Sequence, residues 1–238
     1  MKNISCAVAV FISFLCLNPG VKPSKKFINS YSYHPFISID TIAKDGYTLI
    51  FINKDSAFDL KLKQRMIDAF FTVYPRQVRR FNPAALKSVA FIVDTAYKGI
   101  AATNNGTVRY NPKWFHNHPG DIDVVTHEVM HIVQAYPSGA GPGWLTEGIA
   151  DYARYIYGVD NAGGNWSLTP FSPSHSYTNS YRITARFLVW LEKNINSRIV
   201  DELDAAMRSK TYSKETWNQL TGKTVDELWA DYSQRPEL

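Results

Sequence analysis

Two histidines four residues apart, with a glutamate after the first, form the run His127-Glu128-Val129-Met130-His131. In an α-helix, residues i and i+4 lie on the same face, so both imidazole rings can bind one zinc ion. A glutamate at the second position of such a run can activate water in a metallopeptidase. The run therefore predicts two zinc ligands and a hydrolytic base, provided that the segment is helical.

The residues around this run favour a helix. Val124, Val125, Ile132 and Val133 are apolar at positions that would face a core. Asp121 precedes them and is a residue type that often caps helix N-termini, so we expect the helix to begin there. The alternative interpretation is a pair of core or surface histidines that bind no metal.

A candidate third ligand lies in the segment 143–154. A catalytic zinc ion usually has three protein ligands and one position open to water, and two histidines with one carboxylate are a common set. Glu147 is the carboxylate that we expect to complete this set. Asp151 follows one helical turn later and could accept a hydrogen bond from the free nitrogen of a ligand histidine. Alternatively, both acids are solvated residues near a helix N-terminus, where negative charge is favoured.

Three motifs carry a resemblance to a known family. They are His127-Glu-x-x-His131-x-x-Gln134, Trp144-Leu-Thr-Glu147-Gly-Ile-Ala-Asp151-Tyr152 and Ser180-Tyr181-Arg-Ile-Thr-Ala-Arg186-Phe187-Leu188-x-Trp190-Leu191. From approximately Tyr47 to the C-terminus, the chain resembles the plant basic secretory protein family, a group of zincin-like peptidases of plants and bacteria. The resemblance implies His127, His131 and Glu147 as zinc ligands and Glu128 as the general base.

The implied reaction is zinc-assisted hydrolysis, in which Glu128 carries a proton from water to the leaving amine. The oxyanion that develops needs a hydrogen-bond donor, for which Tyr181 is our first candidate and His175 the second. Tyr181 could instead be a half-buried packing residue at a helix start. Gln134 would orient a ligand or line the floor of the site, and we expect it to make a structural hydrogen bond.

A second His-x-His pair, His116 and His118, lies just before the proposed metal helix. We interpret both as solvent-facing residues beside Pro119 rather than as a second metal site. His34 has no other metal-binding residue type nearby, and we expect no metal there.

The first residues have the features of a secretory signal. Met1 and Lys2 are followed by an apolar run that ends near Leu17 and is too short to span a bilayer. We expect a signal peptide at 1–20, a linker at 21–33 and one zincin-like domain at 34–238. Cys6 and Cys16 both fall in the leader, so the exported chain would have no disulfide, which favours a bacterial secreted or periplasmic protein.

Charge and length limit the expected partners. The net charge of +5 over 238 residues would favour acidic cell-wall or glycan surfaces. Nucleic acid is not an expected partner, because the Lys and Arg residues are scattered and no recognition motif accompanies them. We expect a peptide or protein substrate, with cell-wall proteins and glycoproteins as candidate targets. We also expect no transmembrane helix in the mature form, and a monomer.

The remaining patterns predict an α+β fold: a small mixed N-terminal sheet packed on the metal-binding helix, with a mostly helical C-terminal half. Expected strands are 47–53, 88–94 and 107–110; expected helices are 60–74, 184–194, 198–209, 214–220 and 225–232. Pro75 is expected to end the first helix. By resemblance to zincins, Thr107–Asn111 would be the edge strand that lines the cleft and pairs with an extended peptide.

The leading hypothesis is a secreted zinc-dependent metallopeptidase. The alternative is a zinc-bearing protein on the same scaffold that binds peptide or glycan with little turnover, but the intact Glu128 disfavours it. A purely structural zinc site is disfavoured as well, because such sites usually close the fourth position with another protein ligand.

Overall fold

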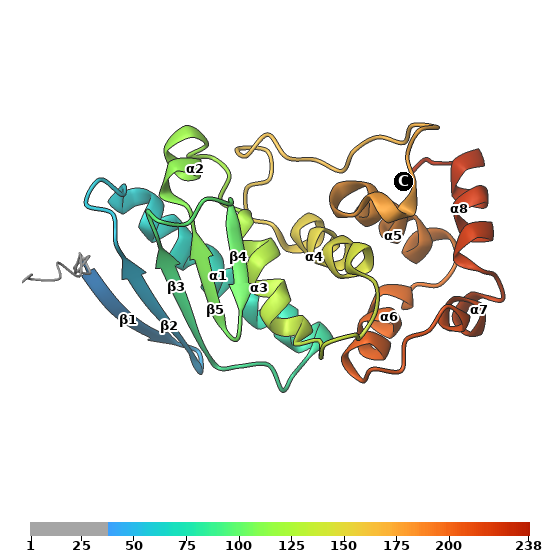
Figure 1. Cartoon of the computed structure of the whole chain (residues 1–238), viewed down its shortest axis with the longest axis horizontal. Coiled ribbons are helices and arrows are strands. Elements are labelled where there is room, and N and C mark those ends of the chain that lie inside the picture. The colour runs from blue at the N-terminus through green and yellow to red at the C-terminus, as the bar shows by residue number, and fades with distance from the viewer. Residues whose placement is uncertain (1–37) are drawn as a thin grey trace, which may run out of the picture. The chain divides into compact units, whose positions relative to one another are not determined.

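The computed structural model describes residues 38–238 (Figure 1). The expected signal peptide and linker, with Cys6, Cys16 and His34, lie outside the described residues. Within 38–238 a five-stranded mixed sheet precedes a mostly helical second half, and this confirms the predicted α+β class. Among the helices of residues 38–238, none combines the length and the hydropathy of a membrane-spanning segment.

The sheet has the strand order β1-β2-β3-β5-β4. Its strands are β1 (Ser38–Lys44), β2 (Tyr47–Asn53), β3 (Ser88–Val93), β4 (Ala101–Asn104) and β5 (Thr107–Tyr110). The three central strands β2, β3 and β5 are parallel, whereas the edge strands β1 and β4 each run antiparallel to their neighbour. The prediction that 107–111 forms the edge was therefore wrong, because the hairpin at Asn104–Thr107 places β4 outside β5.

Eight α-helices follow or interrupt these strands in the described part of the chain, together with one short 3₁₀ helix at Tyr177–Asn179. The α-helices are α1 (Leu60–Phe81), α2 (Pro112–Asn117), α3 (Val124–Gln134), α4 (Gly143–Tyr157), α5 (Tyr181–Asn194), α6 (Ile199–Arg208), α7 (Glu215–Thr221) and α8 (Val225–Gln234). α1 continues through Pro75, contrary to prediction. Proline inside a helix costs about 3 kcal/mol, but Val78 and Phe81 beyond it are buried, at roughly 1.5–3 kcal/mol each. Packing thus outweighs the local penalty.

One face of the sheet forms the core with α1. Phe51, Phe91 and Tyr110 are fully buried on neighbouring strands, with ring centroids 6.2 Å apart for Phe51 and Phe91 and 5.1 Å apart for Phe91 and Tyr110. Phe70 of α1 packs edge-on against Phe91 at 5.5 Å. α3 packs against α1 and against strand β4, so the helix that carries both histidines lies beside the sheet edge (Figure 1).

α4 lies between α3 and the C-terminal helices, and a glycine allows its close approach to α5. A Cβ on Gly148 would lie 2.3 Å from Cγ2 of Thr184, a distance that side chains do not tolerate. Gly148 directly follows Glu147, so this close packing also fixes the position of Glu147 along the axis of α4. The residue next to the proposed ligand is therefore determined by helix packing.

Candidate metal centre

α3 presents His127 and His131 toward Glu147 of α4, and Glu128 toward β4. The helix begins at Val124, with Asp123 rather than the predicted Asp121 at the N-cap position, and no side chain caps it. Asp123 instead accepts hydrogen bonds from the amides of Val159 and Asp160, and this anchors the loop after α4. The helix prediction was correct, but its first residue was placed too early.

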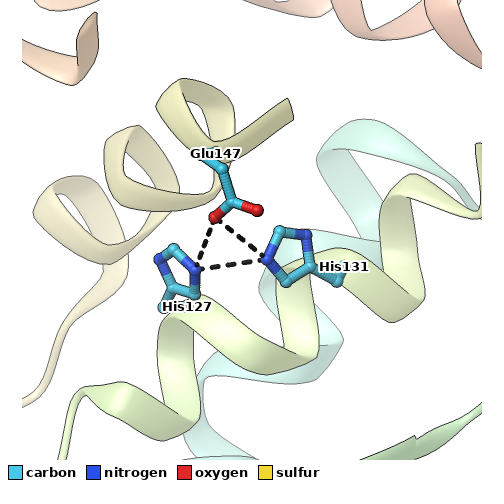
Figure 2. A group of neighbouring side chains, drawn as sticks. All are labelled: His127, His131 and Glu147. Carbon is cyan, nitrogen blue, oxygen red and sulfur yellow. Dashed lines mark hydrogen bonds and ion pairs between the residues drawn. The ribbon is translucent and has the colours of Figure 1, made fainter. Parts of the chain in front are cut away.

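The structure brings His127, His131 and Glu147 together, as Figure 2 shows. The Nε2 atoms of the two histidines are 3.2 Å apart, and Oε2 of Glu147 lies 3.3 Å from Nε2 of His127 and 3.6 Å from Nε2 of His131. A four-coordinate zinc ion with bonds of roughly 2.0–2.2 Å keeps its ligand atoms about 3.3 Å apart. The triangle thus has the size and the donor atoms that zinc requires.

The outer nitrogen of each histidine has its own acceptor. Nδ1 of His127 is 2.6 Å from Oδ1 of Asp151, and Nδ1 of His131 is 2.7 Å from Oε1 of Gln134. The amide nitrogen of Gln134 donates to the carbonyl of Thr146, so its oxygen must face the imidazole. Each Nδ1 therefore carries a proton, and each Nε2 can offer its lone pair to a metal.

Three acidic groups stabilise positive charge at this centre. Burial lowers the pKa of His127, but hydrogen bonds to Asp151 and Glu147 and the charge of Glu128 outweigh it and raise the pKa to about 10. Burial raises the pKa of Glu147, but both histidines hold it well below its usual range. A partly buried cluster with this much negative charge favours a cation, the charge type that a metal ion supplies.

Glu128 points into the same space and is bound by a residue that the sequence did not indicate. The hydroxyl of Thr103 on β4 lies 2.6 Å from Oε2 of Glu128 and 3.0 Å from its backbone carbonyl. Glu128 is buried, and its charge adds to the burial that raises the pKa of the unpaired Tyr110 hydroxyl. The edge strand thus positions the predicted base, and a threonine four residues before β5 gives no recognisable signal for this contact.

Tyr181 covers the metal centre from the start of α5. Its ring stacks on that of His127, with centroids 6.2 Å apart and an interplanar angle of 21°. The charge of Glu147 raises the pKa of Tyr181, with a smaller contribution from burial, so the phenol stays protonated. Ser180 and Tyr181 have φ values of 65° and 51°, which cost about 1–3 kcal/mol per residue and are typical of functional sites. The residue remains 54% exposed, which argues against a mere packing role.

The other predicted candidates divide between those near the centre and those away from it. Gln134 orients His131, as described above, and Asp151 orients His127. His175 makes a local turn, accepting the amide of Ser172 at Nδ1, and does not line the cavity that contains the centre. The structure therefore does not support His175 as an oxyanion donor.

The histidines of the second pair lie apart from the metal triangle. His116 is exposed on α2, with Nε2 3.4 Å from Asp55. His118 is exposed as well, stacks on Trp114 at 3.9 Å, and lines the cavity. Both are exposed, in agreement with the interpretation of both as solvent-facing.

A cavity of about 1030 Å³ contains the metal triangle, Glu128 and Tyr181. Ala101, Ala102 and Thr103 of β4 form part of its wall, and β4 is paired on one side only. The strand that borders the cavity is therefore β4 and not 107–111. The arrangement combines a three-ligand site, a carboxylate, a phenol and an open strand edge, which together suit hydrolysis of an extended chain.

Solved structures with a similar fold include M1 zinc metallopeptidases. A variant of an M1 zinc metallopeptidase from Deinococcus radiodurans matches 84% of this chain and 53% of its own, with a TM-score of 0.53 and 13% identity. The variant bound to a Tyr-Ser-Ala substrate matches 84% of this chain and 51% of its own, with a TM-score of 0.51 and 14% identity. An aminopeptidase N family protein from Idiomarina loihiensis matches 82% of this chain and 46% of its own, with a TM-score of 0.50 and 12% identity. The chain spans about half the length of these structures, and the likeness defines a zincin-like scaffold.

The family is shown by sequence. A family model described as peptidase of plants and bacteria matches residues 37–232, so the chain belongs to this family. The resemblance carried by the three motifs is thereby confirmed. None of the curated proteins matches the chain at a significant level.

Proposed function

We propose that this chain is an exported zinc-dependent peptidase with His127, His131 and Glu147 as its metal ligands. The observation that carries the proposal is the triangle of ligand atoms, 3.2–3.6 Å apart, with both histidines held so that Nε2 faces inward. Family membership supports hydrolysis of peptide bonds. Export rests on the leader pattern at 1–20, and N-terminal sequencing of protein recovered outside the cells tests it.

Bound zinc would supply a water of lowered pKa, about 7, and a Lewis acid that polarises the scissile carbonyl. Glu128 takes the proton of the attacking water and passes it to the leaving amine. Thr103 donates to one carboxylate oxygen of Glu128 and so leaves the other free for this transfer. The peptide lies along the open edge of β4, where backbone hydrogen bonds hold it in extended form.

Tyr181 acts as the hydrogen-bond donor to the oxyanion that develops on the attacked carbonyl. Its raised pKa keeps the proton on the phenol, and its backbone conformation brings the ring over His127. The support for this role is the combination of strain, exposure and proximity. A tyrosine that only filled space would not require two successive residues with positive φ.

The Tyr181→Phe variant should lower kcat by about 10²–10³-fold with little change in KM, because loss of one oxyanion donor acts mainly on the transition state. Steady-state hydrolysis of one peptide by both proteins measures this. Tyr177→Phe is the matched control, since Tyr177 lies four residues earlier and its hydroxyl bonds to Asp226. An unchanged kcat in Tyr181→Phe would assign Tyr181 to packing.

The proposal as a whole is tested with the purified chain and a mixture of proteome-derived peptides. We expect one zinc ion per chain, cleavage of peptides, loss of cleavage after treatment with a chelator and recovery when zinc is added back. Stoichiometric zinc binding without cleavage of any peptide would favour the binding-protein alternative.

A further inference from the structure

Beyond the metal triangle, the cavity extends toward the N-terminal end of α3. Val124 lines it one helical turn before His127, and Arg154 lines it one turn after Asp151 on α4. Because Gln134 of α3 pairs with Thr146 of α4 while His127 pairs with Asp151, the two helices run antiparallel, and Val124 and Arg154 mark the same end. This arm of the cavity is continuous with the proposed reaction centre.

Two indole rings and one imidazole form the wall of this arm. Trp114 donates its Nε1 hydrogen to Oδ2 of Asp121, 2.9 Å away, and His118 stacks on the Trp114 ring. The guanidinium of Arg154 lies 4.6 Å from the ring centroid of Trp166. Each indole is thus fixed by a polar partner, and both are half-buried rather than covered.

The charges in this wall neutralise each other. Asp121 accepts Arg154 at Oδ1, 2.5 Å away, and the Trp114 indole at Oδ2, so both of its oxygens are bound. Arg154 also donates from Nε to Asn161 and is 95% buried, being only 5% exposed. A charged substrate side chain would find no free counter-ion on Asp121, whereas an aromatic side chain would find ring surface.

Glycines join the two segments that carry these aromatic residues. A Cβ on Gly120 would lie 1.9 Å from the carbonyl oxygen of Gly163, and one on Gly164 would lie 3.0 Å from Oδ1 of Asp121. The loop after α2 and the loop after α4 therefore pack directly against each other. The arm is a built part of the fold and not a gap between independent surface loops.

We propose that this arm is a specificity subsite that binds an aromatic side chain of the substrate, at a residue adjacent to the cleaved bond. The inference rests on the proposed peptidase function. Arg182 also lines the cavity and is exposed, so a preference for acidic residues is the competing outcome.

The test compares peptides that differ at one residue. A peptide that the wild-type chain cleaves is made with Phe, Ala or Glu at each position flanking the cleaved bond. We expect kcat/KM to be highest for Phe at one of these positions, and Trp166→Ala to lower the Phe-to-Ala ratio by about 10-fold or more. Val124→Phe, which fills the arm from α3, should lower the same ratio. Tyr155→Ala is the control, because it removes an exposed aromatic ring of α4 that does not line the cavity.

Peptide binding to the zinc-loaded Glu128→Gln protein separates this inference from the proposed function. Tighter binding of the Phe peptide than of the Ala and Glu peptides, lost in the Glu128→Gln Trp166→Ala double variant, supports the subsite even if the wild-type chain cleaves nothing. Equal binding of the three peptides, tightest binding of the Glu peptide, or a Phe preference that survives Trp166→Ala overturns it. Circular dichroism and zinc content confirm that each variant is folded.

Discussion

Substitution of Glu128 by Gln is expected to lower the rate of peptide hydrolysis by about 10²–10⁴-fold, while the protein keeps its fold and its zinc. An amide has nearly the shape of a carboxylate but cannot take a proton from water. Its carbonyl oxygen can still accept the hydroxyl of Thr103, now 2.6 Å from Glu128. Zinc should remain, because Glu128 is not a member of the ligand triangle. Steady-state kinetics and elemental analysis of the same preparation measure both quantities.

The matched control is Glu202→Gln, which makes the same chemical change on α6, outside the cavity. It should leave both the rate and the zinc content unchanged. Undiminished cleavage by Glu128→Gln would remove Glu128 from the role of base. Loss of zinc in that variant would instead indicate that Glu128 supports the metal, and the kinetic result could then not be attributed to proton transfer.

The parts of the site that lie on helices could be predicted from the sequence. Helical periodicity places His127 and His131 on one face, and the same rule places Glu147 and Asp151 on one face of the next long helix. These four side chains meet in the structure because α3 and α4 are adjacent in sequence and pack antiparallel. The sequence does not state which face of α3 packs against α4, although the apolar residues of α3 limit the choice of faces.

The edge of the sheet could not be predicted in the same way. β4 has only four residues, Ala-Ala-Thr-Asn, with no alternation of apolar and polar side chains that would distinguish it from a loop. The prediction therefore ended the sheet at β5, whose Val108 and Tyr110 are fully buried. Full burial of both residues is itself a mark of an internal strand, but it becomes visible only in the folded chain.

Contacts between segments that are distant in the chain could not be predicted from the sequence either. Trp114 and Trp166 are 52 positions apart and are connected through Asp121 and Arg154, a chain of contacts that no local pattern encodes. The positive φ values at Ser180 and Tyr181 are equally unpredictable, because neither residue is glycine and tertiary structure must impose them. The sequence thus predicts the candidate catalytic groups better than it predicts the residues that would position a substrate.

Glu147→Ala should lower zinc affinity far more than Asp151→Ala does. Oε2 of Glu147 lies 3.3 and 3.6 Å from the two inward Nε2 atoms, so its loss removes one of three ligand atoms. Asp151 contacts only the outer Nδ1 of His127, and loss of such a partner typically costs 10–100-fold in affinity. We therefore expect Asp151→Ala to fall within about that range and Glu147→Ala to exceed it. Competition for zinc with a chromogenic chelator gives both dissociation constants.

Asp151→Asn provides the matched control for the orienting role. The asparagine oxygen can still accept the Nδ1 hydrogen of His127, but the negative charge beside the ring is lost, and that charge helps to raise the pKa of His127. Zinc affinity should therefore lie between those of the wild type and Asp151→Ala. If Asp151→Ala instead bound zinc more weakly than Glu147→Ala, Asp151 would be the third ligand. This outcome would also require α4 to turn its face by about 40°, because residues four apart on a helix differ by that angle.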